Sequence, residues 1–288
     1  MIDMLRSKHL IGLLCRVAHV FPSGYYAWRK NAPKRKKKDE EDHILADTIQ
    51  TSCGKKLGKE GYRQVSMRFK GTHNHKKIAR VMKQHGLQAK IRRADPYKKI
   101  PRDGGEHSIA PNILKRAFDH TILWPHRVFG TDITYLRVAD GRGWAYLSAV
   151  KDLCSGEIVA HALSMHPDTD LVLATLDRFA CAISLEDRLG GIMHSDQGCT
   201  YTAQRYQERV RQCGLQVSMS RRGNCIDNAS MESFFGHFKD DLPETLRMHF
   251  QELQECVNSH IMQYNMERKQ WDRNKMTPVE YRDHLLSS

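Results

Sequence analysis

The pattern of hydrophobic positions divides the chain into a helical first part and a β-rich second part. Apolar residues recur every three or four positions over residues 9–30, which is typical of amphipathic helices. From Val128 onward the pattern changes to short alternating runs rich in β-branched and aromatic residues, which indicates strands. Strands are expected at 128–138, 144–150, 157–163, 190–194 and 215–219, and helices at 168–184, 201–213, 227–241 and 250–267. The order βββαβαβα predicts a mixed α/β sheet, with three hairpin-linked antiparallel strands followed by parallel strands and crossover helices.

A helix pair is predicted between residues 60 and 86. Apolar positions predict one short helix before the turn at residues 70–72, and Asn74 then caps a second helix that Gly86 ends. This is the helix-turn-helix pattern, whose second helix can lie in a DNA groove. Many helix pairs with lysine-rich outer faces bind nothing, so this interpretation depends on the charge around the pair. The basic residues on the outer face of the second helix are Lys76, Lys77, Arg80 and Lys83.

Charge strengthens the DNA-binding interpretation of the first part. The 288 residues carry a formal net charge of +13. Residues 1–100 contain 25 Lys and Arg against 8 Asp and Glu, a net +17, whereas residues 101–288 contain 21 against 25, a net −4. A strongly basic segment favours a polyanionic partner. The charged block at residues 34–42 has no apolar face and is interpreted as a linker or a solvated helix start.

Several protein classes are not expected. No stretch of the sequence approaches 18 consecutive apolar residues, so no transmembrane helix is expected. The first 30 residues lack the apolar core of a secretory signal, so a secreted protein is not expected either. The eight cysteines are scattered and form no Cys-x-x-Cys pair, which disfavours a zinc ribbon. We therefore expect reduced cysteines in a cytoplasmic protein without membrane partners.

Three carboxylates lie where such a sheet could gather them. Asp132 is in the middle of a predicted strand, Asp196 follows the predicted strand at 190–194, and Glu232 lies on the helix at 227–241. An Asp buried within a strand is costly unless it is paired or binds a metal. Mg²⁺ takes carboxylate oxygens, and two such ions can support phosphoryl transfer. On spacing alone, Asp196 could equally be a turn residue and Glu232 a solvated helix residue.

The order of motifs resembles a known family. Residues 128–281 are similar to the integrase core of the OrfB-type transposases of the insertion-sequence-three family, within the retroviral-integrase superfamily. The matching segments are Thr131-Asp-Ile-Thr-Tyr135, His194-Ser-Asp-Gln-Gly198 with Tyr201-Thr202, Ser218 to Ala229, Glu232-Ser-Phe-Phe235 with Lys239, and Tyr264-Asn265 with Arg268 and Pro278. Segments at 15–28, 61–63 and 74–87 resemble the family's two N-terminal helical modules.

The resemblance implies a ribonuclease-H-like integrase core preceded by small all-α helix-turn-helix modules. Asp132, Asp196 and Glu232 would then be the D, D, E catalytic residues and the ligands of Mg²⁺ or Mn²⁺, with two ions per active site. The implied activity is hydrolysis at the ends of a mobile element followed by attack of the freed 3′-hydroxyl on DNA. The expected partners are double-stranded DNA, as terminal inverted repeats and as target, further copies of this chain on DNA, and an upstream OrfA product. The expected location is the bacterial cytoplasm, in association with the nucleoid.

Other residues near the three carboxylates have more than one interpretation. Lys239 is seven positions after Glu232, on the same helix face, and is either a phosphate contact or a solvated lysine. A basic loop before that helix either orders on DNA or is plain surface. Asn228 or Asp227 is expected to cap the helix, and Asn228 could also support the metal site. His194 and Gln197 flank Asp196 and could orient it. The loop residues in question are Arg221, Arg222 and Asn224.

Six segments are predicted along the chain. They are a helix-turn-helix-like module at 1–33, a charged linker and helix at 34–58, a second helix-turn-helix module at 59–95, a linker at 96–124, the catalytic core at 125–245 and a C-terminal helical tail at 246–288. The chain departs from the family pattern at Gln270, where a His is common, and at Asp240-Asp241, where Thr-Glu is usual. Two other functions stay open: a DNA-binding regulator with an inactive core, and a simple nuclease of the same fold.

Overall fold

The computed structural model divides into two compact units, Met1–Lys90 and Ile91–Ser288. The structure describes residues 2–69, 71–89, 109–114, 123–140, 143–220, 228–245 and 247–288. The domain boundaries expected from the sequence at 33, 58, 95, 124 and 245 stay predictions.

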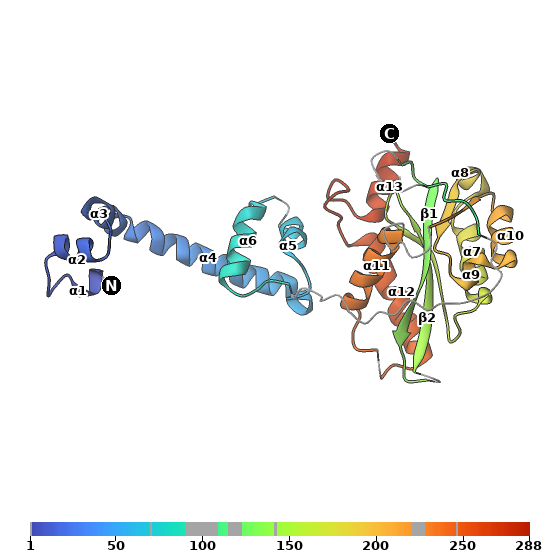
Figure 1. Ribbon diagram of the computed structural model, residues 1–288, viewed down its shortest axis with the longest axis horizontal. Helices are drawn as coiled ribbons and strands as arrows, with labels where there is room; N and C mark the ends of the chain where they lie inside the picture. The colour runs from blue at the N-terminus through green and yellow to red at the C-terminus, as the bar shows by residue number, and fades with distance from the viewer. Residues whose placement is uncertain are drawn as a thin grey trace. The chain divides into compact units, whose positions relative to one another are not determined.

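The first unit is helical (Figure 1). Its elements are α1 (Ile2–Leu5), α2 (Ile11–Val17), α3 (Pro22–Lys30), α4 (Ala32–Cys53), the 3₁₀ turn η1 (Gly54–Lys56), α5 (Tyr62–Arg68) and α6 (His75–Gln84). The charged block at 34–42 lies in the first half of α4, so it is helix rather than linker. The second half of α4 packs with α5 and α6 around a shared core. That core consists of Leu45, Ala46, Ile49, Cys53, Val65, Ile78, Val81 and Met82.

The predicted helix pair forms with the expected caps. The side chain of Asn74 accepts a hydrogen bond from the Lys76 N–H at 2.8 Å, which satisfies a backbone donor in the first turn of α6. Gly86 follows α6 with φ +68°, the left-handed conformation in which glycine carries no steric penalty. Ile78, Val81 and Met82 are buried, as their spacing predicts.

The second unit is a five-stranded sheet with helices on both faces (Figure 1). Its strands are β1 (Val128–Arg137), β2 (Trp144–Asp152), β3 (Ile158–Ser164), β4 (Ile192–Ser195) and β5 (Gln216–Met219). The spatial order is β3-β2-β1-β4-β5. The β1–β2 and β2–β3 pairs are antiparallel, whereas β1–β4 and β4–β5 are parallel. This arrangement confirms the mixed sheet predicted from the sequence.

Two apolar clusters hold the helices on the sheet. The helices are α7 (Thr169–Ala182), α8 (Leu185–Arg188), α9 (Cys199–Thr202), α10 (Gln204–Gln212), α11 (Ala229–Asp241), α12 (Phe250–Met266) and α13 (Pro278–Leu286). One cluster joins β1 through Phe129 to α7, α9 and α10. The other joins β1 through Leu136 to α11 and α12. Because side chains alternate along a strand, Asp132 shares the face of Leu136, which is the face that α11 covers.

Candidate active site

Asp132 lies on β1 in the centre of the sheet. The residue is partly buried, and its Oδ1 atom accepts a hydrogen bond from the Ile133 N–H at 2.8 Å. In the antiparallel pair with β2, Asp132 stands opposite Ala149. Ala149 is fully buried in the apolar cluster on the face that α11 covers.

Asp196 comes directly after β4, the strand that pairs with β1. The parallel register of β1 and β4 pairs Gly130 with His194, and each aspartate comes two residues later. Asp132 in the middle of β1 therefore lies beside the carboxyl end of β4, the kind of strand end where open α/β sheets bind ligands. Asp196 Oδ1 accepts a hydrogen bond from the Gly198 N–H at 2.9 Å.

Burial disfavours the charged form of the Asp196 carboxyl group. Removal from water raises the pKa of the Asp196 carboxyl, and the hydrogen bond from Gly198 lowers it only in part. A carboxylate in this position gains from a nearby cation, because the cation offsets the cost of desolvating its charge. Gly198 suits the tight turn, since a Cβ atom there would lie 3.0 Å from Asp196 Oδ1.

Tyr201 on α9 lies near both aspartates. The residue is 2% exposed. Burial raises the pKa of its phenol well above the ordinary value, and the negative charges of Asp132 and Asp196 raise it further. One phenol that responds to both carboxylates supports their closeness. In the sequence Tyr201 is visible only as part of a motif, because its role depends on a contact between separate elements.

Glu232 lies in the first turn of α11 and is exposed. Its neighbour Met231 is fully buried against β1, where a Cβ atom on Gly130 would lie 3.3 Å from Met231 Cγ. Gly130 thus lets α11 approach the strand that carries Asp132. Within the described residues, however, no group of three or more His, Cys, Asp or Glu side chains is arranged to hold a metal ion. The structure therefore brings Asp132 beside Asp196 and places Glu232 on the covering helix, without closing a three-carboxylate cluster.

A buried lysine lies under the start of α11. Lys151 on β2 stands opposite Gly130 and is 6% exposed. Its Nζ atom donates to the Ser230 carbonyl oxygen at 3.2 Å, in the first turn of the helix that carries Glu232. Burial lowers the pKa of Lys151 to about 7, and the positive charge of Arg273 acts in the same direction. No pattern in the sequence singles out this residue, because a lysine near a strand end normally points to solvent.

Lys239, near the end of α11, contacts an aromatic ring on β1. Its Nζ atom lies 4.1 Å from the centroid of the Tyr135 ring, within the range of a cation–π interaction. Lys239 thus reaches the strand that carries Asp132 from the helix that carries Glu232. Its role as a phosphate contact stays a prediction.

The flanking residues connect the site to β5. His194 Nδ1 lies 2.9 Å from Ser218 Oγ, and the Gln197 side-chain amide donates to the Ser220 carbonyl oxygen at 2.9 Å. Asn228 occupies the N-cap position of α11 and is buried, but its side chain forms no capping hydrogen bond. The expected side-chain cap by Asn228 is therefore absent. Arg221, Arg222, Asn224 and Asp227 lie outside the described residues.

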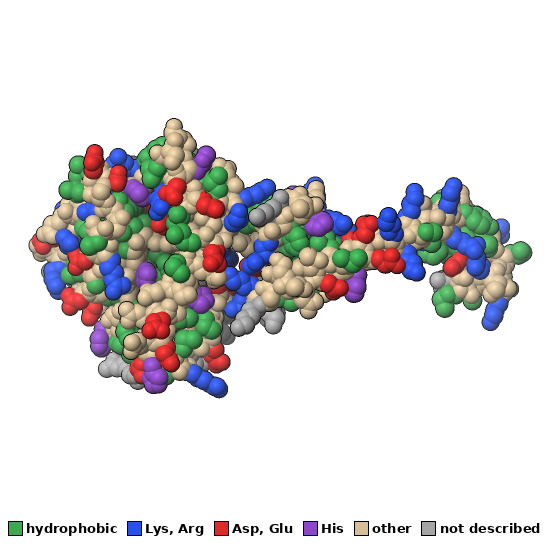
Figure 2. Space-filling view, turned by 180° about the vertical axis from the view of Figure 1, so that it is seen from behind, with side chains coloured by type: hydrophobic (Ala, Val, Ile, Leu, Met, Phe, Trp, Pro, Cys, Tyr) green, Lys and Arg blue, Asp and Glu red, His purple; other side chains and the backbone are tan. Residues whose placement is uncertain are grey.

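The basic residues of α6 differ in their surroundings. Lys76 and Lys83 are exposed, whereas Lys77 and Arg80 are partly buried. The Arg80 guanidinium binds both carboxylate oxygens of Asp42 on α4, at 2.6 and 2.8 Å. That contact holds the pKa of Asp42 below its ordinary value. Lys and Arg side chains gather over the first unit, with Asp and Glu among them along α4 (Figure 2).

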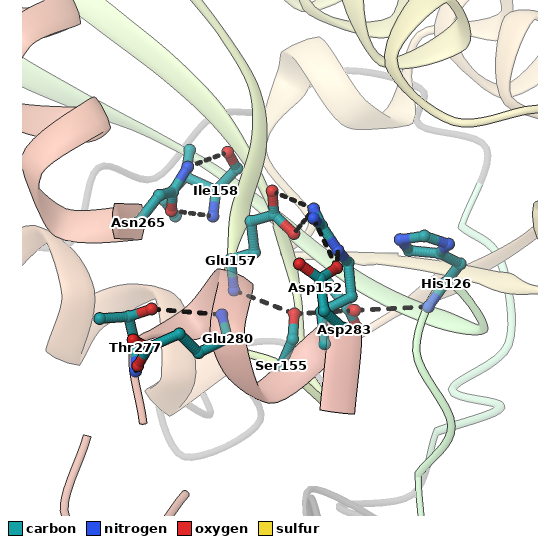
Figure 3. Close-up of polar contacts among 10 residues, drawn as sticks. His126, Asp152, Ser155, Glu157, Ile158, Asn265, Thr277, Glu280 and Asp283 are labelled. Atoms are coloured by element: carbon teal, nitrogen blue, oxygen red, sulfur yellow. Dashed lines mark hydrogen bonds and ion pairs between the residues drawn. The ribbon is translucent and has the colours of Figure 1, made fainter. Parts of the chain in front are cut away.

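A polar cluster ties α12 and α13 to the turn between β2 and β3 (Figure 3). Asn265 on α12 binds the backbone of Ile158 on both sides, accepting from its N–H and donating to its carbonyl oxygen, each at 2.9 Å. Arg282 on α13 donates to both carboxylate oxygens of Glu157, at 2.7 and 2.6 Å.

Buried Asp152, beside this turn, accepts hydrogen bonds from Ser155 Oγ at 2.9 Å and the His126 N–H at 3.3 Å. Because Asn265 binds the backbone of Ile158, the Tyr264-Asn265 motif supports the scaffold of the second unit. The chain's departure from the family pattern at Asp241 is likewise structural, because Asp241 pairs with Arg268.

Comparisons with known proteins agree with a helical first part and an α/β second part. Two family models, each described as an integrase core domain, match residues 124–225 and 213–278, and a model described as an HTH-like domain matches residues 39–95. The HTH-like match covers α5 and α6. In the part of the chain that the structure describes, no helix is long and apolar enough to cross a membrane.

Two relatives span most of their own length in the alignment. An uncharacterized transposase-like protein of Haemophilus influenzae is 36% identical over 215 residues, which cover 74% of this chain and 95% of the relative. A putative transposase, InsK, for the insertion sequence element IS150 of Escherichia coli is 32% identical over 98% of this chain and 96% of its own.

Solved structures show a weaker similarity. The catalytic core of HTLV-2 integrase in complex with magnesium is 17% identical, with a TM-score of 0.41, over 56% of this chain and 98% of that chain. The sequence relatives and the family models together decide the assignment. The chain belongs to the insertion-sequence-three family of OrfB-type transposases, and it is a polynucleotidyl transferase with an integrase core and an HTH-like domain.

Proposed function

We propose that this transposase binds the terminal inverted repeats of its insertion sequence, cuts DNA at those ends and joins the freed ends to target DNA. The observation that carries the proposal is the parallel register of β1 and β4, which brings Asp132 on β1 beside Asp196 in the turn after β4, with the helix that carries Glu232 packed on the Asp132 face of β1. In this proposal the three carboxylates are the catalytic residues, and the exposed basic residues of α6 contact DNA.

The carboxylates are suited to Mg²⁺ or Mn²⁺, which prefer oxygen ligands. Partial burial of Asp132 and Asp196 supports this fit, since a cation would offset the cost of desolvating their charges. Asp132, Asp196 and Glu232 would hold two ions. When bound, such ions lower the pKa of the attacking hydroxyl or water and stabilise the leaving oxygen.

The reaction needs two displacements at phosphorus. In the first, a water oxygen bonds to phosphorus and the bond from phosphorus to the 3′-oxygen breaks, which leaves a 3′-hydroxyl at the element end. In the second, that 3′-oxygen bonds to a target phosphorus and loses its proton to solvent, while the bond from that phosphorus to the target 3′-oxygen breaks and the leaving oxygen takes up a proton from solvent. The protein's part is to hold the strands in line, and in this proposal Lys239 contacts a phosphate near Glu232.

The proposed partners follow from the reaction. Cutting two distant ends together requires more than one active site, so we expect the chain to assemble as a homo-oligomer on double-stranded DNA. An upstream OrfA product is a further expected partner. Because the substrate is chromosomal DNA, we expect the protein in the bacterial cytoplasm, at the nucleoid.

A metal-dependent cleavage assay on duplexes that carry candidate element ends tests the proposal. We expect Asp132→Asn, Asp196→Asn and Glu232→Gln to reduce cleavage and joining to background while end binding persists. Glu186→Gln, an exposed carboxylate on α8, is the matched control and should keep full activity. Full strand transfer by Asp196→Asn would contradict the assignment of the three carboxylates as catalytic residues. Nicking without joining would favour the simple nuclease, and end binding without any cleavage would favour the regulator with an inactive core.

A further inference from the structure

Four side chains form a continuous aromatic and cationic strip on β1, β2 and α11. The rings of Tyr135 and Trp144 meet edge to face, with centroids 5.1 Å apart. The Arg137 guanidinium carbon lies 4.3 Å from the Trp144 centroid, and Lys239 Nζ lies 4.1 Å from the Tyr135 centroid. The order along the strip is therefore Lys239, Tyr135, Trp144, Arg137.

The strand pairing explains how the strip is built. Arg137 and Trp144 are direct partners in the antiparallel β1–β2 register. Tyr135 is two positions before Arg137 and so shares its face, which makes Tyr135 and Trp144 diagonal neighbours. The parallel register of β4 with β1 ends at Gly130, so this end of β1 extends past the register with β4.

The strip is open to solvent. Tyr135 is 54% exposed, Arg137 is exposed, and Trp144 and Lys239 are partly exposed. Large aromatic side chains on the inner strands of a sheet normally enter the core. Here two of them lie outside both apolar clusters and instead support two cations. Each ring limits the positions that its cation can adopt, so the two charges are held rather than mobile.

The strip begins on the two elements that carry Asp132 and Glu232, and strand alternation puts Tyr135 on the other face of β1 from Asp132. Tyr135 is three residues after Asp132 on β1, and Lys239 is seven residues after Glu232 on α11. It then leads away from the aspartates toward the hairpin that joins β1 to β2. Its four members carry two positive charges and no carboxylate, which is the chemistry that binds a phosphodiester backbone.

We propose that Tyr135, Trp144 and Arg137 form, together with Lys239, a binding strip for the duplex DNA of the element end. The inference rests on the proposed function, since it names where the first substrate lies. We assign the strip to the element end rather than to target DNA because it adjoins both elements that carry the candidate catalytic residues. The duplex that occupies the active site when the first bond is cut is the element end. Arg137 contacts a backbone phosphate, and Tyr135 and Trp144 position the two cations.

The test measures cleavage of a labelled element-end duplex by the full chain over a range of duplex and salt concentrations. The variants are Arg137→Gln, Trp144→Leu, Tyr135→Leu and Tyr135→Phe. The matched control is Arg205→Gln, an exposed arginine of α10 that pairs with exposed Asp170. Loss of one phosphate contact should reduce the slope of log affinity against log salt by about 0.9.

We expect Arg137→Gln to raise the KM for the end duplex by roughly five- to tenfold, with little change in kcat, and to reduce the salt slope by about one unit. Tyr135→Leu and Trp144→Leu should show smaller changes in the same direction. Tyr135→Phe keeps the ring and should behave as the parent chain does, as should Arg205→Gln. Thermal unfolding of each variant shows whether a loss comes from misfolding. If Tyr135→Leu fails to fold, Arg137→Gln and Trp144→Leu still decide whether the strip binds DNA.

Other results would overturn the inference. One is an unchanged KM and salt slope in Arg137→Gln while Asp196→Asn is inactive, which would leave the proposed function standing without the strip. Another is a changed dependence of joining on target DNA, measured with pre-cut ends, while end cleavage is unaffected. A changed oligomeric state with unaltered end cleavage would instead assign the strip to a protein interface. Strand transfer by Asp196→Asn would remove the proposed function itself.

Discussion

The Nζ atom of Lys151 donates to the carbonyl oxygen of Ser230 across 3.2 Å, two residues before Glu232 in α11. This contact joins the centre of the sheet to the first turn of the candidate catalytic helix. A positive charge is unfavourable beside a helix N-terminus, and burial adds to the cost. The protein therefore keeps a costly group where it can fix the position of the helix.

Lys151→Met is expected to raise stability and to lower activity. The pKa falls from 10.5 in the unfolded chain to about 7 in the folded one, which corresponds to about 4–5 kcal/mol as an upper bound. Because methionine also loses the Ser230 hydrogen bond, we expect a gain of about 1–3 kcal/mol near pH 7. Cleavage should fall, since the first turn of α11 loses its tie to β2.

The stability gained in Lys151→Met should depend on pH. Between pH 7 and 10.5 the unfolded chain holds a proton on Lys151 that the folded chain has released, so the parent chain gains stability as pH rises. The advantage of Lys151→Met should therefore be largest at about pH 7 and below, and should shrink toward pH 10. Thermal unfolding at acidic, neutral and alkaline pH measures it, with Lys269→Met, at a partly exposed lysine, as control. An advantage that does not depend on pH would contradict the buried, partly neutral lysine.

Asn265→Leu should destabilise the second unit. The substitution keeps a similar size but removes two hydrogen bonds to the backbone of buried Ile158. The lost partners leave an N–H and a carbonyl oxygen inside the protein, at a cost of about 2–4 kcal/mol in total. For a unit of this size the melting temperature should fall by roughly 5–15 °C.

The control for Asn265 is another asparagine of α12. Asn258 is exposed, and its side-chain oxygen lies 2.8 Å from His161 Nε2. Asn258→Leu should change the free energy of unfolding by less than about 1 kcal/mol. Equal losses of unfolding free energy in Asn265→Leu and Asn258→Leu would mean that the Tyr264-Asn265 motif does not stabilise the fold.

Substitutions of Arg80 and Lys76 on α6 should have different effects, the first on stability and the second on DNA binding. Arg80→Gln breaks the contact with buried Asp42, and we expect a loss of about 1–3 kcal/mol of local stability. Lys76→Gln removes an exposed charge, which should weaken DNA binding without a change in stability. Hydrogen exchange of α4 and α6 in the full chain measures the first effect, and end-binding affinity measures the second.

Acid should act on the same pair through Asp42. Its pKa is lowered in the folded chain by the Arg80 hydrogen bond, so its contribution is complete above the unfolded value of 3.8 and is lost as pH falls below it. Asp42→Asn should remove that acid dependence from the exchange of α6. If Arg80→Gln weakens DNA binding as Lys76→Gln does and leaves exchange unchanged, the ion pair is not the main role of Arg80.

The sequence predicted those features that depend on neighbours along the chain. The Asn74 cap, the Gly86 helix end and the buried spacing of Ile78 and Val81 are set by local geometry. The directions of the strand pairs were also predicted, because hairpin turns join antiparallel strands and crossover helices join parallel ones. The charged block at 34–42 was ambiguous, since its helix continues into the apolar half of α4 and the partner of Asp42, Arg80, is 38 residues away in the sequence.

Features that depend on contacts between distant segments are not predictable in the same way. Lys151 is buried only because α11 covers it, and Tyr201 responds to two aspartates that come from different strands. Asn228 has the residue type and position of a cap, yet its side chain forms no capping bond. Glu232 lies on the expected helix, but the distance between that helix and the two aspartates is a tertiary property.

Gly198→Ala should impair catalysis while leaving the fold and end binding intact. Gly198 has φ −63° and ψ 152°, which alanine adopts readily, so the substitution causes no backbone strain. The added Cβ atom would lie 3.0 Å from Asp196 Oδ1 and should displace that carboxylate by a few tenths of an ångström. Small displacements of a reacting group are costly, and we expect kcat for end cleavage to fall by roughly 10- to 100-fold.

Gly61→Ala is the matched control for this prediction. Gly61 is also the N-cap of a short helix, with φ −74° and ψ 163°, but a Cβ atom there would meet nothing within 4 Å. Both variants should unfold within about 0.5 kcal/mol of the parent chain. A loss of cleavage in Gly198→Ala alone would connect the turn after β4 to the chemistry through Asp196. Full cleavage by Gly198→Ala would show that the orientation set by this turn does not limit the reaction.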